Sequence, residues 1–116
     1  MTTTTPTSDE ILIVWVPFPD RTSALSVAQS AVEARLCACV NVIPGAVSVY
    51  RWEDKIVEEN EVIAVFKTHA QREDALRAWI EARHPYDVPC LASWSMRGVN
   101  DAWKTWLTAE VSMGTM

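Results

Sequence analysis

Apolar positions along the chain follow two periods, one typical of strands and one typical of helices. Residues 11–16 form a continuous apolar run, which predicts a central strand covered on both faces. Asp20 is expected to cap a helix, because apolar residues then recur at helical spacing until a stop near Arg35 and Leu36. The inward stripe of this helix is expected to contain Ala24, Ala28, Ala31, Val32 and Leu36.

A long hairpin is predicted over residues 39–68, because two alternating segments flank a short polar turn at 53–55. Pro44 has no N–H to give to a ladder and Gly45 tolerates unusual dihedral angles, so this pair predicts a bend or bulge. The seven residues between the bend and the turn reach about 23 Å at roughly 3.3 Å per residue. The tip of the hairpin is therefore expected to project beyond the rest of the sheet.

The second half of the chain predicts a helix, a short strand and a last helix. Residues 68–71 match a capping box, and Pro85 ends the helix because the residue before a proline is disfavoured in helical conformation. A strand over residues 90–96 follows, and then a helix capped by Asn100 or Asp101. The packed positions of these two helices are expected to be Ala75, Leu76, Trp79, Ile80, Trp103, Trp106 and Leu107.

This order of elements predicts an α+β fold, a ferredoxin-like βαββαβ sandwich with a long central β-hairpin and an extra C-terminal helix. Residues 10–110 are expected to form a single domain, between tails at 1–9 and 111–116. Two helices cover one face of the sheet, which leaves apolar side chains on the other face and an open edge. Such surfaces favour self-association.

Composition narrows the classes of function. The chain has 116 residues and a net charge of −5, which argues against nucleic acid or an anionic membrane as the main partner. Its apolar runs are far shorter than the roughly 20 residues that a membrane span needs, and no signal peptide is evident. Three cysteines are an odd number, so a disulfide framework is not expected and a reducing compartment, the cytoplasm, is predicted.

Several segments together carry a resemblance to a known family. Residues 38–45 read Ala-Cys-Val-Asn-Val-Ile-Pro-Gly, and residues 48–55 read Ser-Val-Tyr-Arg-Trp-Glu-Asp-Lys. Phe-Lys-Thr at 66–68 and His-Pro-Tyr-Asp-Val-Pro at 84–89 follow in order, and Trp106-Leu107 lies near the end. Over residues 11–108 the chain resembles the CutA family, known as divalent-cation tolerance proteins.

The resemblance implies a homotrimer of ferredoxin-like subunits whose long hairpins pair across neighbours. It also implies a role in tolerance of copper and other divalent ions, with no established reaction and no required cofactor. We therefore expect a protein that is not an enzyme, with copper or another divalent cation as its candidate metal. The fold is similar to that of PII signalling proteins, which bind small ligands between subunits. The alternative is thus a small-ligand-binding regulatory trimer, although the turn at 53–55 is too short for a long regulatory loop.

The chain also departs from the family pattern. Cys90 stands where the family usually has a glutamate after the second proline of the His-Pro-Tyr motif. Trp15 and Arg83 stand where a cysteine and a histidine have been proposed as copper ligands in some relatives. The copper chemistry of those relatives is therefore not carried over to this chain.

His84, Cys90 and Cys39 are the candidate metal ligands, because imidazole and thiolate suit copper or zinc. The alternative is that His84 closes a helix by hydrogen bonding while Cys90 packs as a small apolar group. Cys37 and Cys39 form a Cys-x-Cys pair suited to Cu(I), or else Cys39 lies in the core and Cys37 at a junction. A thiol enzyme would need Cys90 as nucleophile and His84 as base, without an evident acid to orient the histidine.

Two further pairs are candidates for binding surfaces. Lys67 and Tyr86 are expected to line a pocket between subunits, where the lysine would bind an anion or pair with an acid. Tyr50 and Trp52 are expected to anchor the trimer interface, because aromatic rings bury a large area. A cluster of acids around the hairpin tip suits hard cations, or else keeps the tip solvated and blocks unwanted edge pairing. These acids are Glu53, Asp54, Glu58, Glu59 and Glu61.

Overall fold

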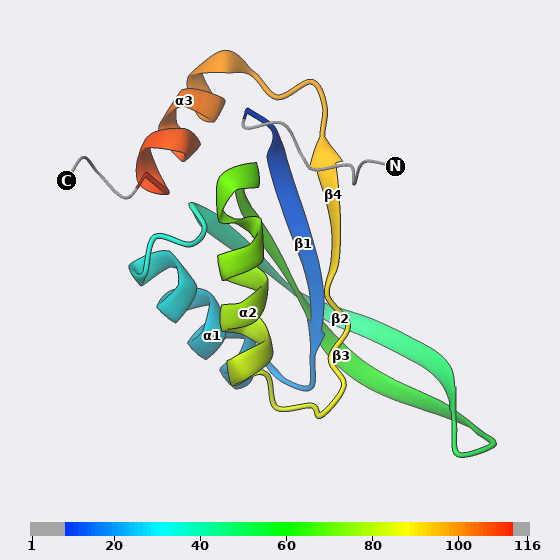
Figure 1. Ribbon diagram of the computed structural model, residues 1–116. Helices are drawn as coiled ribbons and strands as arrows, with labels where there is room; N and C mark the ends of the chain where they lie inside the picture. The colour runs from blue at the N-terminus through cyan, green and yellow to red at the C-terminus, as the bar shows by residue number, and fades with distance from the viewer. Residues whose placement is uncertain (1–8, 113–116) are drawn as a thin grey trace, which may run out of the picture.

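The computed structural model describes residues 9–112, which form a four-stranded antiparallel sheet with three α-helices (Figure 1). The strand order is β2-β3-β1-β4. In chain order the elements are β1 (Ile11–Phe18), α1 (Arg21–Glu33), β2 (Cys39–Trp52), β3 (Lys55–His69), the 3₁₀ turn η1 (Ala70–Arg72), α2 (Glu73–Arg83), β4 (Ala92–Met96) and α3 (Asp101–Glu110). The predicted α+β ferredoxin-like arrangement with an added C-terminal helix is confirmed. The predicted tails lie outside the described residues except for Asp9, Val111 and Ser112.

The main core lies between one face of the sheet and the helices α1 and α2. Alternate residues of β1 and β3 point into it, as the period of two requires: Val14, Val16, Phe18, Ala64 and Phe66. Leu76 and Ile80 of α2 are fully buried against them, as predicted, but Ala75 is exposed. Within the described residues, no helix is long and apolar enough to cross a membrane.

The other face of the sheet is only partly covered. A second cluster joins α3 to one end of this face through Ile11, Ala38, Leu107 and Val111. Further along, the alternation of β1 and its partners leaves Trp15, Trp94 and Ile43 on this face, with 37%, 48% and 46% of their surfaces exposed. We call the surface formed by Trp15, Trp94 and Ile43 the open face. The expectation that β1 is covered on both sides is therefore wrong at Trp15.

Helix α1 begins as predicted and ends earlier than predicted. The Asp20 carboxylate accepts a hydrogen bond of 2.8 Å from the backbone N–H of Ser23, which makes it the N-cap. The helix stops at Glu33, and Arg35 adopts a left-handed φ of 60° that turns the chain toward β2. Leu36 is still buried, but Val32 is 41% exposed and does not belong to the inward stripe.

The hairpin of β2 and β3 has the predicted bulge and a tighter turn than predicted. Pairing shifts register between Ile43 and Ala46, with Gly45 at a φ of +88°. The turn has two residues rather than three, because Lys55 already pairs with Trp52 while Glu53 and Asp54 have φ of 49° and 65°. Two consecutive positive φ angles match the twist of the flanking strands. The part beyond the bulge, residues 46–61, is called the arm here; it projects away from the helices and the body of the sheet (Figure 1).

The predicted capping box at residues 68–71 is wrong. β3 continues to His69, which pairs with Ile11 of β1, and α2 starts only at Glu73 after the turn η1. The Thr68 hydroxyl donates a 2.7 Å hydrogen bond to the carbonyl oxygen of Leu36 instead of capping a helix. The ladder with β1 keeps this segment extended, and tertiary pairing overrides the local signal.

The boundaries after α2 match the prediction only in part. α2 ends at Arg83, before Pro85, and His84 at its C-cap has an extended ψ of 140°. β4 is shorter than the predicted strand and begins at Ala92, so Cys90 lies in the connection between α2 and β4. Asn100 occupies the N-cap of α3 without a side-chain hydrogen bond.

Candidate functional site

A groove of about 780 Å³ lies between the arm and the connection from α2 to β4. We call it the arm groove. Its aromatic lining residues are Tyr50, Trp52 and Tyr86, and its carboxylates are Glu59, Glu61 and Asp87. Its other lining residues are Pro17, Val57, Pro85, Val88 and Cys90. Strand alternation places Glu59 and Glu61 on the same side of β3, which is also the side of the open face.

His84 holds the connection that forms one wall of this groove. Its Nδ1 accepts a hydrogen bond of 3.0 Å from the backbone N–H of Tyr86, so Nε2 carries the proton and donates to the Pro17 carbonyl oxygen at 2.8 Å. The ring also stacks on Phe18 with centroids 4.4 Å apart. Burial lowers the pKa of His84 below its ordinary value. The imidazole is thus neutral and fully hydrogen-bonded, and it places Tyr86 over the groove.

Glu61 is the most buried carboxylate of the groove, with only 8% of its surface exposed. One carboxylate oxygen accepts from the Ser48 hydroxyl at 2.5 Å, and the other accepts from the Tyr86 hydroxyl at 2.7 Å. Burial and the bond to Glu61 raise the pKa of Tyr86 well above that of free tyrosine. The phenol therefore remains a donor at neutral pH and joins the arm to the α2–β4 connection.

A second tyrosine–glutamate pair lies on the arm itself. The Tyr50 hydroxyl donates a hydrogen bond to Glu59, and this bond raises the pKa of Tyr50. The titration of Tyr86 also responds to the charge of Glu59 and to Tyr50, so the two pairs are close enough to interact electrostatically. Within residues 9–112 the ion pairs are Arg35–Glu110 and Lys104–Asp9, so the groove carboxylates have no cationic partner in this part of the chain.

The predicted metal ligands are not brought together in one chain. His84 is buried with both ring nitrogens engaged, Cys90 is exposed at the groove, and Cys39 begins β2 opposite Lys67. Among the described residues, no group of three or more histidine, cysteine, aspartate or glutamate side chains is arranged to hold a metal ion. Metal binding by these three residues stays a prediction, and binding at His84 would require the loss of one of its hydrogen bonds.

Cys37, rather than Cys39, is the core cysteine. Its side chain is buried in the main cluster, and burial raises its pKa to about 12. Cys39 is half-buried, and burial raises its pKa as well. Both groups are therefore neutral thiols at neutral pH, whereas the ligand for Cu(I) is the thiolate.

The predicted pocket pair is separated within the chain. Tyr86 lines the arm groove, whereas Lys67 lies six positions beyond Glu61 on β3, with its ammonium 5.7 Å from the centroid of the Trp103 ring of α3. Tyr50 and Trp52, the predicted interface anchors, are 38% and 59% exposed. Their contribution to an interface stays a prediction.

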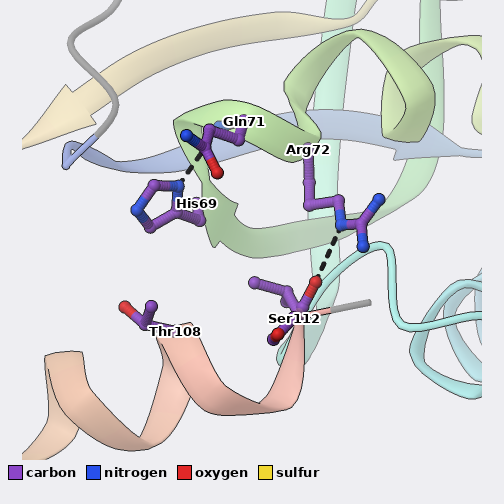
Figure 2. Close-up of a pocket in the computed structure, with 6 residues that line it drawn as sticks. His69, Gln71, Arg72, Thr108 and Ser112 are labelled. Carbon is purple, nitrogen blue, oxygen red and sulfur yellow. Dashed lines mark hydrogen bonds between the residues drawn. The ribbon is translucent and has the colours of Figure 1, made fainter. Parts of the chain in front are cut away.

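A second hollow, of about 330 Å³, lies between η1 and the end of α3 (Figure 2). Within it the Arg72 Nε donates a 2.7 Å hydrogen bond to the Val111 carbonyl oxygen, and His69 Nδ1 accepts from the backbone of Gln71 (Figure 2). The Arg72 bond joins η1 to the C-cap of α3, and the His69 bond is local to the start of η1. We assign this hollow a structural role.

The sequence analysis missed the arm groove because it placed Glu59 and Glu61 with the other acids at the tip. The structure separates them: Glu59 and Glu61 line the groove, with Glu59 exposed and Glu61 buried, whereas the other three acids are exposed and lie outside it. A usable signal was present, because Glu61 continues the alternation of Ile63 and Val65 on one face of β3. Its partner Tyr86 comes from a connection 25 residues away, which alternation does not reveal.

Comparison with known proteins gives a consistent result. The profile of the family described as CutA1 divalent ion tolerance protein matches residues 12–110. The divalent-cation tolerance protein CutA of Thermus thermophilus is 35% identical over 99 residues, covering 85% of this chain and 94% of that protein. The chloroplastic CutA of Arabidopsis thaliana is also 35% identical, over 83% of this chain, which spans about half (53%) of that longer protein.

Solved structures agree with this match. The crystal structure of CutA from Xylella fastidiosa superposes with a TM-score of 0.87 at 32% identity, covering 89% of this chain and 99% of that one. CutA1 from Oryza sativa has a TM-score of 0.87 at 32% identity, covering 94% of this chain and all of that one (100%). The likeness therefore extends over almost the whole described fold.

Proposed function

Because the chain belongs to the CutA family of divalent ion tolerance proteins, we propose that it acts as a homotrimer in tolerance of divalent metal ions such as copper, without catalysing a reaction. The observation that carries this proposal is the apolar surface of the arm and the open face. Val49, Trp52 and Ile56 of the arm are each more than half exposed, and Trp15, Trp94 and Ile43 add to this surface. Extended apolar patches of this kind mark interaction sites.

A trimer also accounts for the lack of a complete metal site within residues 9–112 of one chain. The carboxylates of the arm groove and the thiol of Cys90 are incomplete ligand sets by themselves. Apposition of neighbouring arms would bring equivalent groups from different copies together. Tyr50 and Trp52 would then lie at the border between copies.

The arrangement of Cys90 and His84 supports a role without catalysis. A thiol nucleophile needs a base with a free nitrogen within hydrogen-bond reach. Both nitrogens of His84 are engaged with Pro17 and Tyr86, so the ring cannot take a proton from Cys90 without rearrangement.

The proposal is tested by two measurements on the purified protein. Light scattering after size-exclusion chromatography is expected to give three times the mass of one chain, and a stable single chain at micromolar concentration would refute the assembly. Titration calorimetry with Cu²⁺ is expected to show binding to the native assembly that weakens in Cys90→Ala. If copper binding is unchanged in Cys90→Ala, in His84→Ala and in Cys39→Ala, then none of the three residues is a metal ligand.

A small-ligand-binding regulatory trimer is the second candidate function. The arm groove favours it, since about 780 Å³ lies within the roughly 300–1,000 Å³ range of small-molecule sites. Melting temperatures measured with small molecules in the absence of metal distinguish this candidate from the first.

We also propose the cytoplasm as the site of action. Cys37, Cys39 and Cys90 are free thiols, which suits a reducing compartment. The names of relatives mention a chloroplast and a periplasm, so location varies among them. Fractionation of cells expressing the protein tests this point.

A further inference from the structure

The geometry points to the arm groove as a binding site for a small organic cation, namely an alkylammonium compound with an apolar body. The inference rests on the second candidate function, ligand binding at this groove, and does not require metal binding.

The charge of the groove is one-sided. Glu59, Glu61 and Asp87 line it, and no lysine, arginine or histidine is among its lining residues. Tyr50 and Tyr86 donate neutral hydrogen bonds to Glu59 and Glu61, which fix the carboxylates in place without cancelling their charge. A cation that enters the groove therefore meets oriented negative groups whose side-chain entropy is already lost.

The same hydrogen bonds make the groove better suited to an ammonium group than to a bare metal ion. A metal requires several donor atoms converging at short distances, and among the described residues no three histidine, cysteine, aspartate or glutamate side chains are arranged to hold one. An ammonium group needs only acceptors for its N–H bonds. Each carboxylate oxygen of Glu61 accepts one bond from the chain and has a second lone pair.

The rest of the lining suits an organic body. Tyr50, Trp52 and Tyr86 bring three aromatic rings to the groove, and cations attached to carbon are attracted to ring faces. Val57 and Val88 add apolar surface, and Val88 is 80% exposed without a ligand. A metal aquo ion would gain nothing from these groups, whereas an alkyl chain buries them.

Titration calorimetry of the intact protein with hexylammonium chloride tests the inference, with 1-hexanol as a probe of similar shape and no charge. We expect hexylammonium to bind at least about tenfold more tightly than hexanol, because only the cation gains from the carboxylates and rings. Equal affinity for the two probes, or no binding of hexylammonium up to about 10 mM, would overturn the inference.

Two matched variants locate the site. Glu59→Gln keeps an acceptor for Tyr50 and removes one groove charge; we expect about tenfold weaker hexylammonium binding. Glu58→Gln removes the same charge one residue away, where the side chain is exposed and does not line the groove, and should leave binding within about twofold. Equal losses in both variants would mean nonspecific attraction and would refute the site.

Trp52→Leu provides an independent test, because Trp52 is exposed and its replacement leaves the core intact. The substitution should weaken the binding of hexylammonium several-fold more than the binding of hexanol. The mass of every variant is measured first by light scattering, so that loss of assembly is recorded separately from loss of binding. If the native assembly instead fills the groove with a lysine or arginine of another copy, hexylammonium will bind only to variants that no longer associate, and the inference fails.

Discussion

At the scale of single residues, His84 joins three parts of the fold. Its ring stacks on Phe18, its Nε2 donates a hydrogen bond to the Pro17 carbonyl oxygen near the end of β1, and its Nδ1 accepts one from the backbone N–H of Tyr86. It therefore fixes the α2–β4 connection against the sheet. The placement of the groove tyrosine depends on a histidine that the sequence offered both as a metal ligand and as a residue that closes a helix by hydrogen bonding.

The neutral state of His84 predicts a pH dependence of stability. Burial lowers the pKa of both His84 and His69 below the ordinary 6.5 that an unfolded chain retains. Below about pH 6.5 the unfolded chain thus binds more protons than the folded chain, and the free energy of unfolding falls as the pH falls. We expect urea denaturation to give a larger free energy at pH 7.5 than at pH 5.5, with a smaller difference in His84→Phe. Greater stability at pH 5.5 would contradict this prediction.

Tyr86→Phe tests the bond between the connection and the arm. The variant keeps the ring and removes one of the two donors to the buried Glu61. We expect the free energy of unfolding to fall by about 1–2 kcal/mol in urea denaturation. Tyr50→Phe removes the hydrogen bond to the exposed Glu59 and is the control. It should lower the free energy of unfolding by a smaller amount. Equal losses would show that burial of Glu61 is unimportant.

At the scale of elements, the bulge of the hairpin and the position where β3 ends have different physical causes. The bulge at Gly45 follows from the residues Pro44 and Gly45 themselves. The end of β3 does not follow from local chemistry, because pairing of His69 with Ile11 extends the strand through a segment that resembles a helix start. The extension to His69 lengthens β3 within the body of the sheet, at the end of the strand opposite to the arm.

The turn of the arm carries a measurable backbone cost. Glu53 and Asp54 both have left-handed φ angles, which asparagine and glycine adopt more readily. We expect Glu53→Asn combined with Asp54→Gly to raise the free energy of unfolding by about 0.5–1 kcal/mol. Asp54→Val should lower it by about 1 kcal/mol or more, because a β-branched residue resists this conformation. Urea denaturation measures both, and a stabilising Asp54→Val would refute the two-residue turn.

At the scale of the whole molecule, apolar surface is distributed unevenly between the two sides of the sheet. The helices α1 and α2 enclose the main core on one face, while α3 covers only an end of the other. The arm extends this open side beyond the body of the domain (Figure 1). A chain built in this way is expected to associate through the open face and the arm.

Ile43→Glu tests the interface at this scale. Ile43 is 46% exposed on the open face, so a charge there should be tolerated in one chain but should oppose the burial that association needs. We expect light scattering to show a mass reduced toward that of a single chain at micromolar concentration. Val32→Glu is the matched control, since Val32 is 41% exposed on α1, on the helical side of the molecule. A loss of assembly in the control alone would place the interface on the helices.

The sequence by itself determined the order of the elements and the boundaries that depend on neighbouring residues. Asp20 starts α1 and Pro85 follows the end of α2 because capping and proline sterics act within a few positions. The alternation along β3 likewise fixed which side chains share a face. The combined motifs were also sufficient to identify the family.

Only the tertiary structure decided the features that join distant segments. Glu61 meets Tyr86 across 25 positions, and Thr68 bonds to Leu36 across 32, so neither contact has a local signature. The hydrogen bond from His84 Nε2 to the Pro17 carbonyl oxygen spans 67 positions and likewise has no local signature, whereas the bond to Tyr86 is local. Local patterns encode dihedral preferences and periodicity, whereas burial and hydrogen-bond partners are set by the packing of the whole fold.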